Sequence, residues 1–160
     1  MRANLPVIIC AAALSAFSCG SCNNAGDAGF TDIPAAGWAY GDTLRFTPDP
    51  ADSIVPGRLA VAVRHTGSYL YSNLWLEITS PVPGDTVLRV DTVNVPLADD
   101  FGRWYGRGYG VSFVTVDTLP SSYVFERGSD VTVRHIMRKD TVAGLEQIGL
   151  LFLSSEDNRK

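Results

Sequence analysis

Two histidines, His65 and His135, are the only imidazole side chains in the chain, and each ends a valine-rich run. Imidazole can bind zinc or transfer a proton near neutral pH, so two histidines joined by a carboxylate in a sheet would form a metal site. No third ligand for such a site can be identified. We therefore expect both histidines to be structural residues that form hydrogen bonds in the core.

The other residue types used in catalysis are poorly placed. The chain has no Gly-x-Ser-x-Gly motif, and its three cysteines all lie at or before Cys22. No glycine-rich loop precedes a helix that could hold phosphate. The carboxylates mostly flank predicted strands, where they cap turns and offer no evident acid–base pair: Asp85, Asp91, Asp99, Asp100, Asp117 and Asp130. We expect no enzyme activity, no metal, no cofactor and no small-molecule substrate.

Aromatic residues are the remaining candidates for a functional site. Rings in or beside loops offer a large contact area at low entropic cost, as sugar-binding and protein-binding faces require. The alternative is that the rings cover loop backbones and the ends of the fold. The candidate binding residues are Tyr69, Tyr71, Asn73, Trp75, Trp104, Tyr105 and Tyr109.

The first 18 residues are typical of a bacterial lipoprotein signal peptide. Arg2 supplies the positive start, and an uncharged apolar run from Leu5 to Phe17 is too short to span a bilayer comfortably. Small residues precede Cys19, so we interpret Cys19 as the lipid-modified N-terminus. Cys22 is the alternative acceptor, and ordinary signal cleavage is the alternative process. Residues 19–29 then form the lipidated N-terminus and a flexible tether to the membrane.

The rest of the chain predicts one domain over residues 30–154, followed by a polar tail at 155–160. Cleavage before Cys19 leaves 160 minus 18, or 142, residues, which suits a single domain. Loss of Arg2 changes the formal net charge from −4 to −5. A mildly acidic surface without basic runs argues against a nucleic-acid partner.

Short apolar runs separated by Gly, Pro and Asp turns predict about eight strands. Arg58–Thr79 reads as a central β-hairpin, and Asp85–Leu97 as a strand whose change of phase predicts a bulge near Asp91. The last strand, Ile148–Leu153, is apolar on both faces and should be central. Residues 140–147 contain the only helix signal of the mature chain, a single turn. The fold class is all-β, a single antiparallel, jelly-roll-like β-sandwich.

Two strands match each other in residue type and phase. Val61 to His65 reads Val-Ala-Val-Arg-His, and Val131 to His135 reads Val-Thr-Val-Arg-His. We interpret them as equivalent strands of a pseudo-symmetric sandwich.

Beyond the lipoprotein signal, four sequence features together resemble the gliding motility-associated GldH lipoprotein family of Bacteroidetes. They are Trp38 followed by Asp42 and Phe46, the tract RHTGSYLYSNLWL from Arg64 to Leu76, the series Gly102-x-Trp104-x-Gly106-x-Gly108, and the closing segments Met137-Arg138 and Ile148-Gly149-Leu150. The resemblance implies a non-enzymatic accessory of the gliding apparatus, a system allied to type IX secretion, that contacts other envelope proteins. It offers no catalytic residues to transfer.

Two features refine that expectation. No acidic pair follows Cys19, so we place the lipoprotein on the periplasmic face of the outer membrane. The exposed aromatic residues leave a second class of function open, a carbohydrate-binding β-sandwich lipoprotein.

Overall fold

The protein is an all-β sandwich in its computed structural model, which describes residues 28–50 and 52–154. Its strands are β1 (Ala28–Asp32), β2 (Trp38–Ala39), β3 (Leu44–Phe46), β4 (Ile54–Thr66), β5 (Asn73–Pro81), β6 (Leu88–Pro96), β7 (Arg107–Tyr109), β8 (Ser112–Glu126), β9 (Val131–His135), β10 (Thr141–Val142) and β11 (Leu145–Ser154). The predicted fold class is confirmed. The described strands outnumber the predicted eight in part because β2, β7 and β10 are too short to show a periodic pattern, and in part because β1 was not predicted and begins at Ala28, within the segment expected to be the tether.

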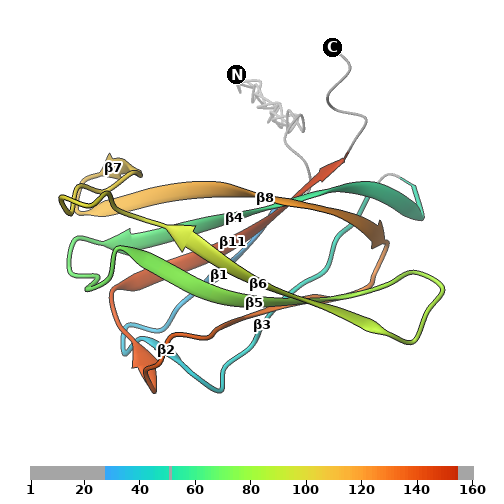
Figure 1. Ribbon diagram of the computed structural model, residues 1–160, viewed down its shortest axis with the longest axis horizontal. Coiled ribbons are helices and arrows are strands. Elements are labelled where there is room, and N and C mark those ends of the chain that lie inside the picture. The colour runs from blue at the N-terminus through green and yellow to red at the C-terminus, as the bar shows by residue number, and fades with distance from the viewer. Residues whose placement is uncertain (1–27, 51, 155–160) are drawn as a thin grey trace, which may run out of the picture.

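Two antiparallel sheets face each other across the core (Figure 1). One has five strands in the order β1-β11-β4-β8-β7, the other has four in the order β3-β9-β5-β6, and β2 pairs with β10 in a small separate sheet. β4 and β11 are both inner strands of the larger sheet, as is β8, which confirms the central positions predicted for β4 and β11 from their apolar faces. The predicted helical turn at 140–147 is wrong, because β10 and the start of β11 occupy that segment.

The predicted hairpin at Arg58–Thr79 is also wrong. β4 pairs with β11 and β8, whereas β5 pairs with β6 and β9 in the opposite sheet. At the end of β4, the Thr66 N–H still bonds the Gly144 carbonyl of the larger sheet. Six residues later, the Ser72 carbonyl already accepts the Leu97 N–H beside β6. Residues 67–72 are therefore an arch over one end of the core, which periodicity cannot distinguish from a hairpin loop.

The predicted bulge near Asp91 is wrong as well, because β6 pairs with β5 in unbroken register from Leu88 to Pro96. Leu88 and Val90 face solvent, and the inward positions are taken by Arg89 and Asp91. These two side chains pair at 2.7 Å, and the Tyr123 hydroxyl of β8 donates to Asp91 at 2.8 Å. Inward charged residues are a known means of blunting an edge strand. Here they made a regular strand look as if its phase had shifted.

The matched strands β4 and β9 occupy equivalent environments in the two sheets. In each, two valines point into the core, and the arginine forms an ion pair with a glutamate of a neighbouring strand: Arg64 with Glu146, and Arg134 with Glu77. Each histidine is buried edge-on against a tryptophan, His65 against Trp104 and His135 against Trp38. This pairing gives the sandwich a local pseudo-symmetry centred on the two Val-x-Val-Arg-His strands.

Candidate functional site

Three loops meet at one end of the sandwich. They are the arch 67–72, the β6–β7 connection 97–106, and the turn at 110–111, and we call them together the loop end. Backbone hydrogen bonds join them: Leu97 and Ala98 donate to the Ser72 carbonyl at 2.8 and 2.9 Å, and Gly67 donates to the Val111 carbonyl at 3.3 Å. In Figure 1 this is the end at which β7 and the β4–β5 connection lie. The loops therefore form one bonded surface.

Tyr69 lies beneath this surface with only 3% of its area exposed. Its hydroxyl donates to the Asn73 carbonyl at 2.9 Å, and its ring contacts those of His65 and Tyr71. Burial raises the pKa of Tyr69, which keeps the hydroxyl protonated. Gly144 leaves room for the Tyr69 backbone, because a Cβ there would lie 2.8 Å from it, and Gly144 has a φ of +86°. Tyr69 therefore anchors the arch from inside the core.

His65 is the centre of a buried aromatic cluster under the loop end. Trp104 lies edge-on at 4.5 Å between ring centroids, and Phe113 stacks at 5.6 Å. The ring Nδ1 bonds the Thr66 carbonyl at 2.9 Å, while Nε2 is buried without a hydrogen-bond partner. Burial lowers the pKa of His65 and favours the neutral ring. The residue thus supports the loops above it.

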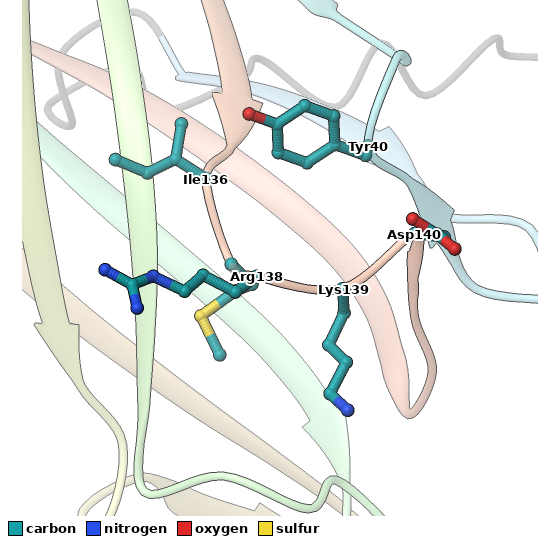
Figure 2. Close-up of a pocket in the computed structure, with 6 residues that line it drawn as sticks. Tyr40, Ile136, Arg138, Lys139 and Asp140 are labelled. Carbon is teal, nitrogen blue, oxygen red and sulfur yellow. The ribbon is translucent and has the colours of Figure 1, made fainter.

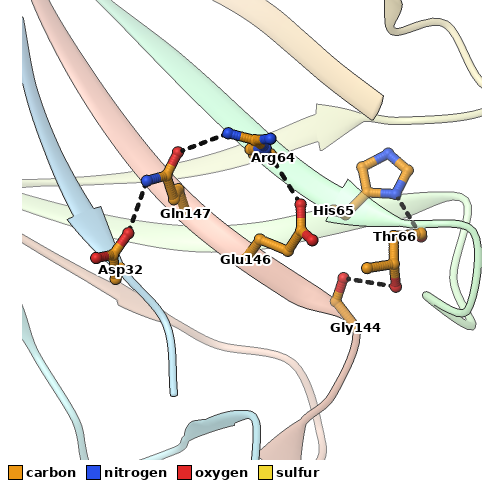
Figure 3. Close-up of polar contacts among 7 residues, drawn as sticks. All are labelled: Asp32, Arg64, His65, Thr66, Gly144, Glu146 and Gln147. Atoms are coloured by element: carbon orange, nitrogen blue, oxygen red, sulfur yellow. Dashed lines mark hydrogen bonds and ion pairs between the residues drawn. The ribbon is translucent and has the colours of Figure 1, made fainter. Parts of the chain in front are cut away.

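A polar network on the outer face of the larger sheet stiffens the same end (Figure 3). The Arg64 guanidinium lies 3.2 Å from Glu146 and donates to Gln147, whose amide in turn donates to Asp32 at 2.6 Å. These contacts link β4, β11 and β1. Near the loop end, the larger sheet is therefore held by the His65 cluster on its inner face and by this polar network on its outer face.

Large apolar side chains project from this rigid frame into solvent. Leu70 and Phe101 are 83% and 86% exposed, and Tyr105 and Val111 are also exposed. Phe101 is held at its apex because the Asp99 carboxylate accepts the backbone N–H groups of Phe101 and Arg103, each at 2.9 Å. Leu70, Phe101 and Val111 were missed by sequence reasoning, which considered polar-tipped aromatic residues. Each lies one or two residues after a residue of a predicted loop or turn, namely Tyr69, Asp99 and Gly110. These neighbours were the sequence signals that could have indicated an exposed loop position.

The sequence-predicted binding residues are divided between this surface and its support. Tyr105 and Trp75 are exposed, Tyr71, Asn73 and Trp104 are half-buried, and Tyr69 is buried. Tyr109 lies in β7 opposite Ser112, and its side chain falls outside the described part of the chain. The lipid acceptor Cys19 and its alternative Cys22 also lie outside the described residues.

A shallow cavity of about 240 Å³ lies beside Trp75, where β9 leads into β10 (Figure 2). The Trp75 carbonyl accepts the Ile136 N–H at 2.9 Å, and the Trp75 backbone N–H donates to the Met137 sulfur at 3.4 Å. The cavity is lined by Tyr40, Ile136, Met137, Arg138, Lys139 and Asp140. It therefore lies next to the start of β5, the strand that follows directly after the arch 67–72 of the loop end.

The two histidines do not form a shared site. His65 lies in the larger sheet and His135 in the smaller one, and His135 Nε2 bonds the Trp38 carbonyl at 3.1 Å. Within residues 28–50 and 52–154, no three His, Cys, Asp or Glu side chains gather in a way that could hold a metal ion. In the same ranges, no helix is long and apolar enough to cross a membrane.

A family model described as GldH lipoprotein matches residues 28–151. The chain belongs to the GldH lipoprotein family. The match covers every strand from β1 to most of β11, and so includes both the loop end and the cavity beside Trp75. Membership indicates a gliding-associated, membrane-anchored lipoprotein of the cell envelope, as the sequence resemblance implied.

The solved structures that this GldH-family chain resembles are distant. An exo-β-1,3-galactanase from Phanerochaete chrysosporium, solved with galactose, is 16% identical with a TM-score of 0.34; the match covers 79% of this chain and 26% of the galactanase. Cocksfoot mottle virus gives 12% identity and a TM-score of 0.30 over 98% of both chains. No curated protein matches the sequence.

Proposed function

We propose that this protein is a lipid-anchored, non-enzymatic component of the envelope machinery for gliding and type IX secretion, and that it binds another envelope protein through its loop end. GldH family membership supports the link to gliding and to the envelope. The contact itself is inferred from the surface of the sandwich.

The observation that carries this proposal is an apolar surface on a rigid support. Leu70, Phe101, Tyr105 and Val111 are exposed on loops that are hydrogen-bonded to one another above the His65 cluster. A rigid loop loses little conformational entropy on binding, and large exposed apolar side chains gain the most from burial. Several exposed apolar side chains gathered on neighbouring loops are a candidate interaction site.

Membrane attachment is proposed to occur through Cys19, with the domain on the periplasmic face of the outer membrane. Acyl chains on one cysteine give durable anchoring, and residues 20–27 are small and polar enough to act as a tether. Palmitate labelling should be lost in Cys19→Ala and kept in Cys22→Ala. The opposite pattern would move the attachment to Cys22.

An affinity pull-down of the intact lipoprotein from its native envelope tests the partner contact. The double variant Leu70→Ser, Phe101→Ser should fold normally, since both side chains are almost fully exposed, and should lose the captured protein. Val116→Ser is the matched control, because Val116 is an exposed apolar residue on β8. It should retain the partner.

Two results would contradict the proposal. One is a partner that binds the wild type and the Leu70/Phe101 variant equally well. The other is glycan-array binding that is abolished by alanine at the exposed Trp75, which would favour the carbohydrate-binding alternative.

A further inference from the structure

The cavity beside Trp75 has a cationic rim in an otherwise acidic protein. Arg138 and Lys139 are both exposed, and in residues 28–50 and 52–154 no ion pair joins either of them to a carboxylate. The arginines at positions 45, 64, 89, 103, 127 and 134 have carboxylate partners, whereas within the same described ranges Arg58 and Arg107 also lack an ion pair but lie outside the cavity. The Lys139 N–H bonds the Met137 carbonyl at 2.7 Å, a tight turn that presents Arg138 to solvent.

Tyr40 forms a wall of the cavity, and its position is fixed by buried residues. Its N–H donates to the Asp140 carbonyl at 2.8 Å, and its ring lies edge-on to His135 at 5.6 Å. His135 is itself held by the Trp38 carbonyl. Figure 2 shows the Tyr40 ring on one side of the cavity, with Arg138 and Lys139 extending from the loop opposite it. The Asp140 carboxylate lies on the far side of Lys139 from the Arg138 guanidinium, so it leaves that cation available.

The remaining wall is apolar. Ile136 is half-buried and Met137 is buried, and both line the cavity. A methionine thioether adapts its shape to different apolar side chains. A charged rim over an apolar wall matches a peptide that carries a carboxylate next to an apolar residue. A sugar acid would supply the carboxylate but no apolar side chain.

We propose that this cavity binds an acidic segment of a partner polypeptide, whose carboxylates pair with Arg138 and Lys139 and whose neighbouring apolar side chain packs against Ile136 and Met137. A cavity of about 240 Å³ has room for one such side chain. The inference rests on the proposed function, because it gives the chemistry of a partner that also contacts the adjoining loop end.

The test is an NMR titration of the full chain, purified in detergent, with short probes. Acetyl-Glu-Leu-Glu is the probe, acetyl-Gln-Leu-Gln-amide is its neutral control, and trigalacturonate represents a sugar acid. The acidic peptide should shift the amide signals of Tyr40 and of residues 136–140 saturably. Arg138→Gln with Lys139→Gln should weaken this binding roughly tenfold, because two exposed ion pairs are lost. Arg107→Gln is the matched control, an exposed arginine on β7 outside the cavity, and should not change the affinity.

The proposal is overturned if the neutral peptide gives the same shifts, if the double variant binds as tightly as the wild type, or if only trigalacturonate binds. These outcomes leave the proposed function standing as long as the pull-down still depends on Leu70 and Phe101. Conversely, loss of that dependence with an intact peptide titration would refute the loop-end contact and keep the cavity.

Discussion

At the residue scale, the two histidines that looked most like catalytic or metal-binding groups are parts of the core. His65 and His135 are fully buried, each bonds a backbone carbonyl through one ring nitrogen, and each is enclosed by aromatic rings. Burial lowers the pKa of both, so both favour the neutral form. Protonation of these two rings should therefore change the stability of the fold.

The pH dependence of unfolding should report these two residues. A histidine whose pKa is lower in the folded state than in the unfolded state binds its proton more tightly when unfolded, so stability is lost as the pH falls from about 6.5 towards the folded-state pKa. We expect the urea midpoint to be lower at pH 5.5 than at pH 8. The carboxylates with lowered pKa values, Glu77, Asp99 and Asp130, stabilise the fold at both pH values and lose that contribution only at more acidic pH, so they do not change the comparison.

Histidine-to-asparagine variants provide the control for this measurement. His65→Asn and His135→Asn should each reduce the difference between the two midpoints, if they fold. NMR titration of the wild-type imidazoles gives a second readout, with both pKa values expected below 6.5. Equal midpoints at the two pH values, or imidazole pKa values above 6.5, would contradict the structural assignment.

Tyr69 illustrates what a sequence can indicate about a single residue. Its position in a tyrosine-rich loop was visible, whereas its burial was not, because the arch that covers it is completed by residues 97–106 and by Gly144, distant in sequence. Loss of cellular activity in Tyr69→Ala would therefore mix a folding defect with a binding defect. Phe101, which is 86% exposed, separates the two effects.

At the element scale, the strands that were predicted correctly from the sequence are those with simple burial patterns. β4 and β9 have consistent apolar positions and were predicted with the right residues facing the core, and β11 was predicted to be central, although it runs from Leu145 to Ser154 and is longer than the predicted Ile148–Leu153. β6 was misread because its solvent face carries Leu88 and Val90 while Arg89 and Asp91 point inward. Hydrophobic periodicity assumes that charge marks the outside, and here Tyr123 satisfies the inward charges instead.

The corrected register of β6 predicts an inverted pattern of mutational cost. Asp91→Ala should lower the free energy of unfolding by about 1–3 kcal/mol, because it leaves the hydroxyl of the buried Tyr123 without its acceptor. Val90→Ser, the matched neighbour on the solvent face, should change it by less than about 0.5 kcal/mol. Urea denaturation measures both. A larger loss of unfolding free energy for Val90→Ser than for Asp91→Ala would contradict the unbroken register of β6 and support the predicted bulge near Asp91.

At the scale of the whole molecule, composition and turn spacing were enough to predict an all-β sandwich, but not which strands share a sheet. The pairing of β4 with β8 and β11, and the resulting crossing of residues 67–72 between sheets, depend on contacts between distant segments. That crossing builds the loop end. The candidate surface could therefore be located only in part, through Tyr105, while Leu70 and Phe101 required the fold.

The two ends of the sandwich also differ. At the loop end, apolar side chains project from loops that are hydrogen-bonded to one another, whereas at the other end, where β4 begins and β11 finishes, the exposed apolar side chains Ile54, Val82, Val87 and Leu88 lie at the start of β4 and around the β5–β6 turn. β1 runs towards the loop end, so its first residue, Ala28, lies at the opposite end of the sandwich. In the proposed attachment through Cys19, the chain would reach the domain at that opposite end and leave the loop end accessible to a neighbouring protein.

Site-specific photo-crosslinking in living cells tests the central claim most directly. With benzoylphenylalanine at position 101, the account predicts one discrete adduct to an envelope protein, the same protein that the pull-down recovers. The same probe at position 116 on β8 should give none. No adduct at position 101, or the same adduct at both positions, would contradict a partner contact at the loop end.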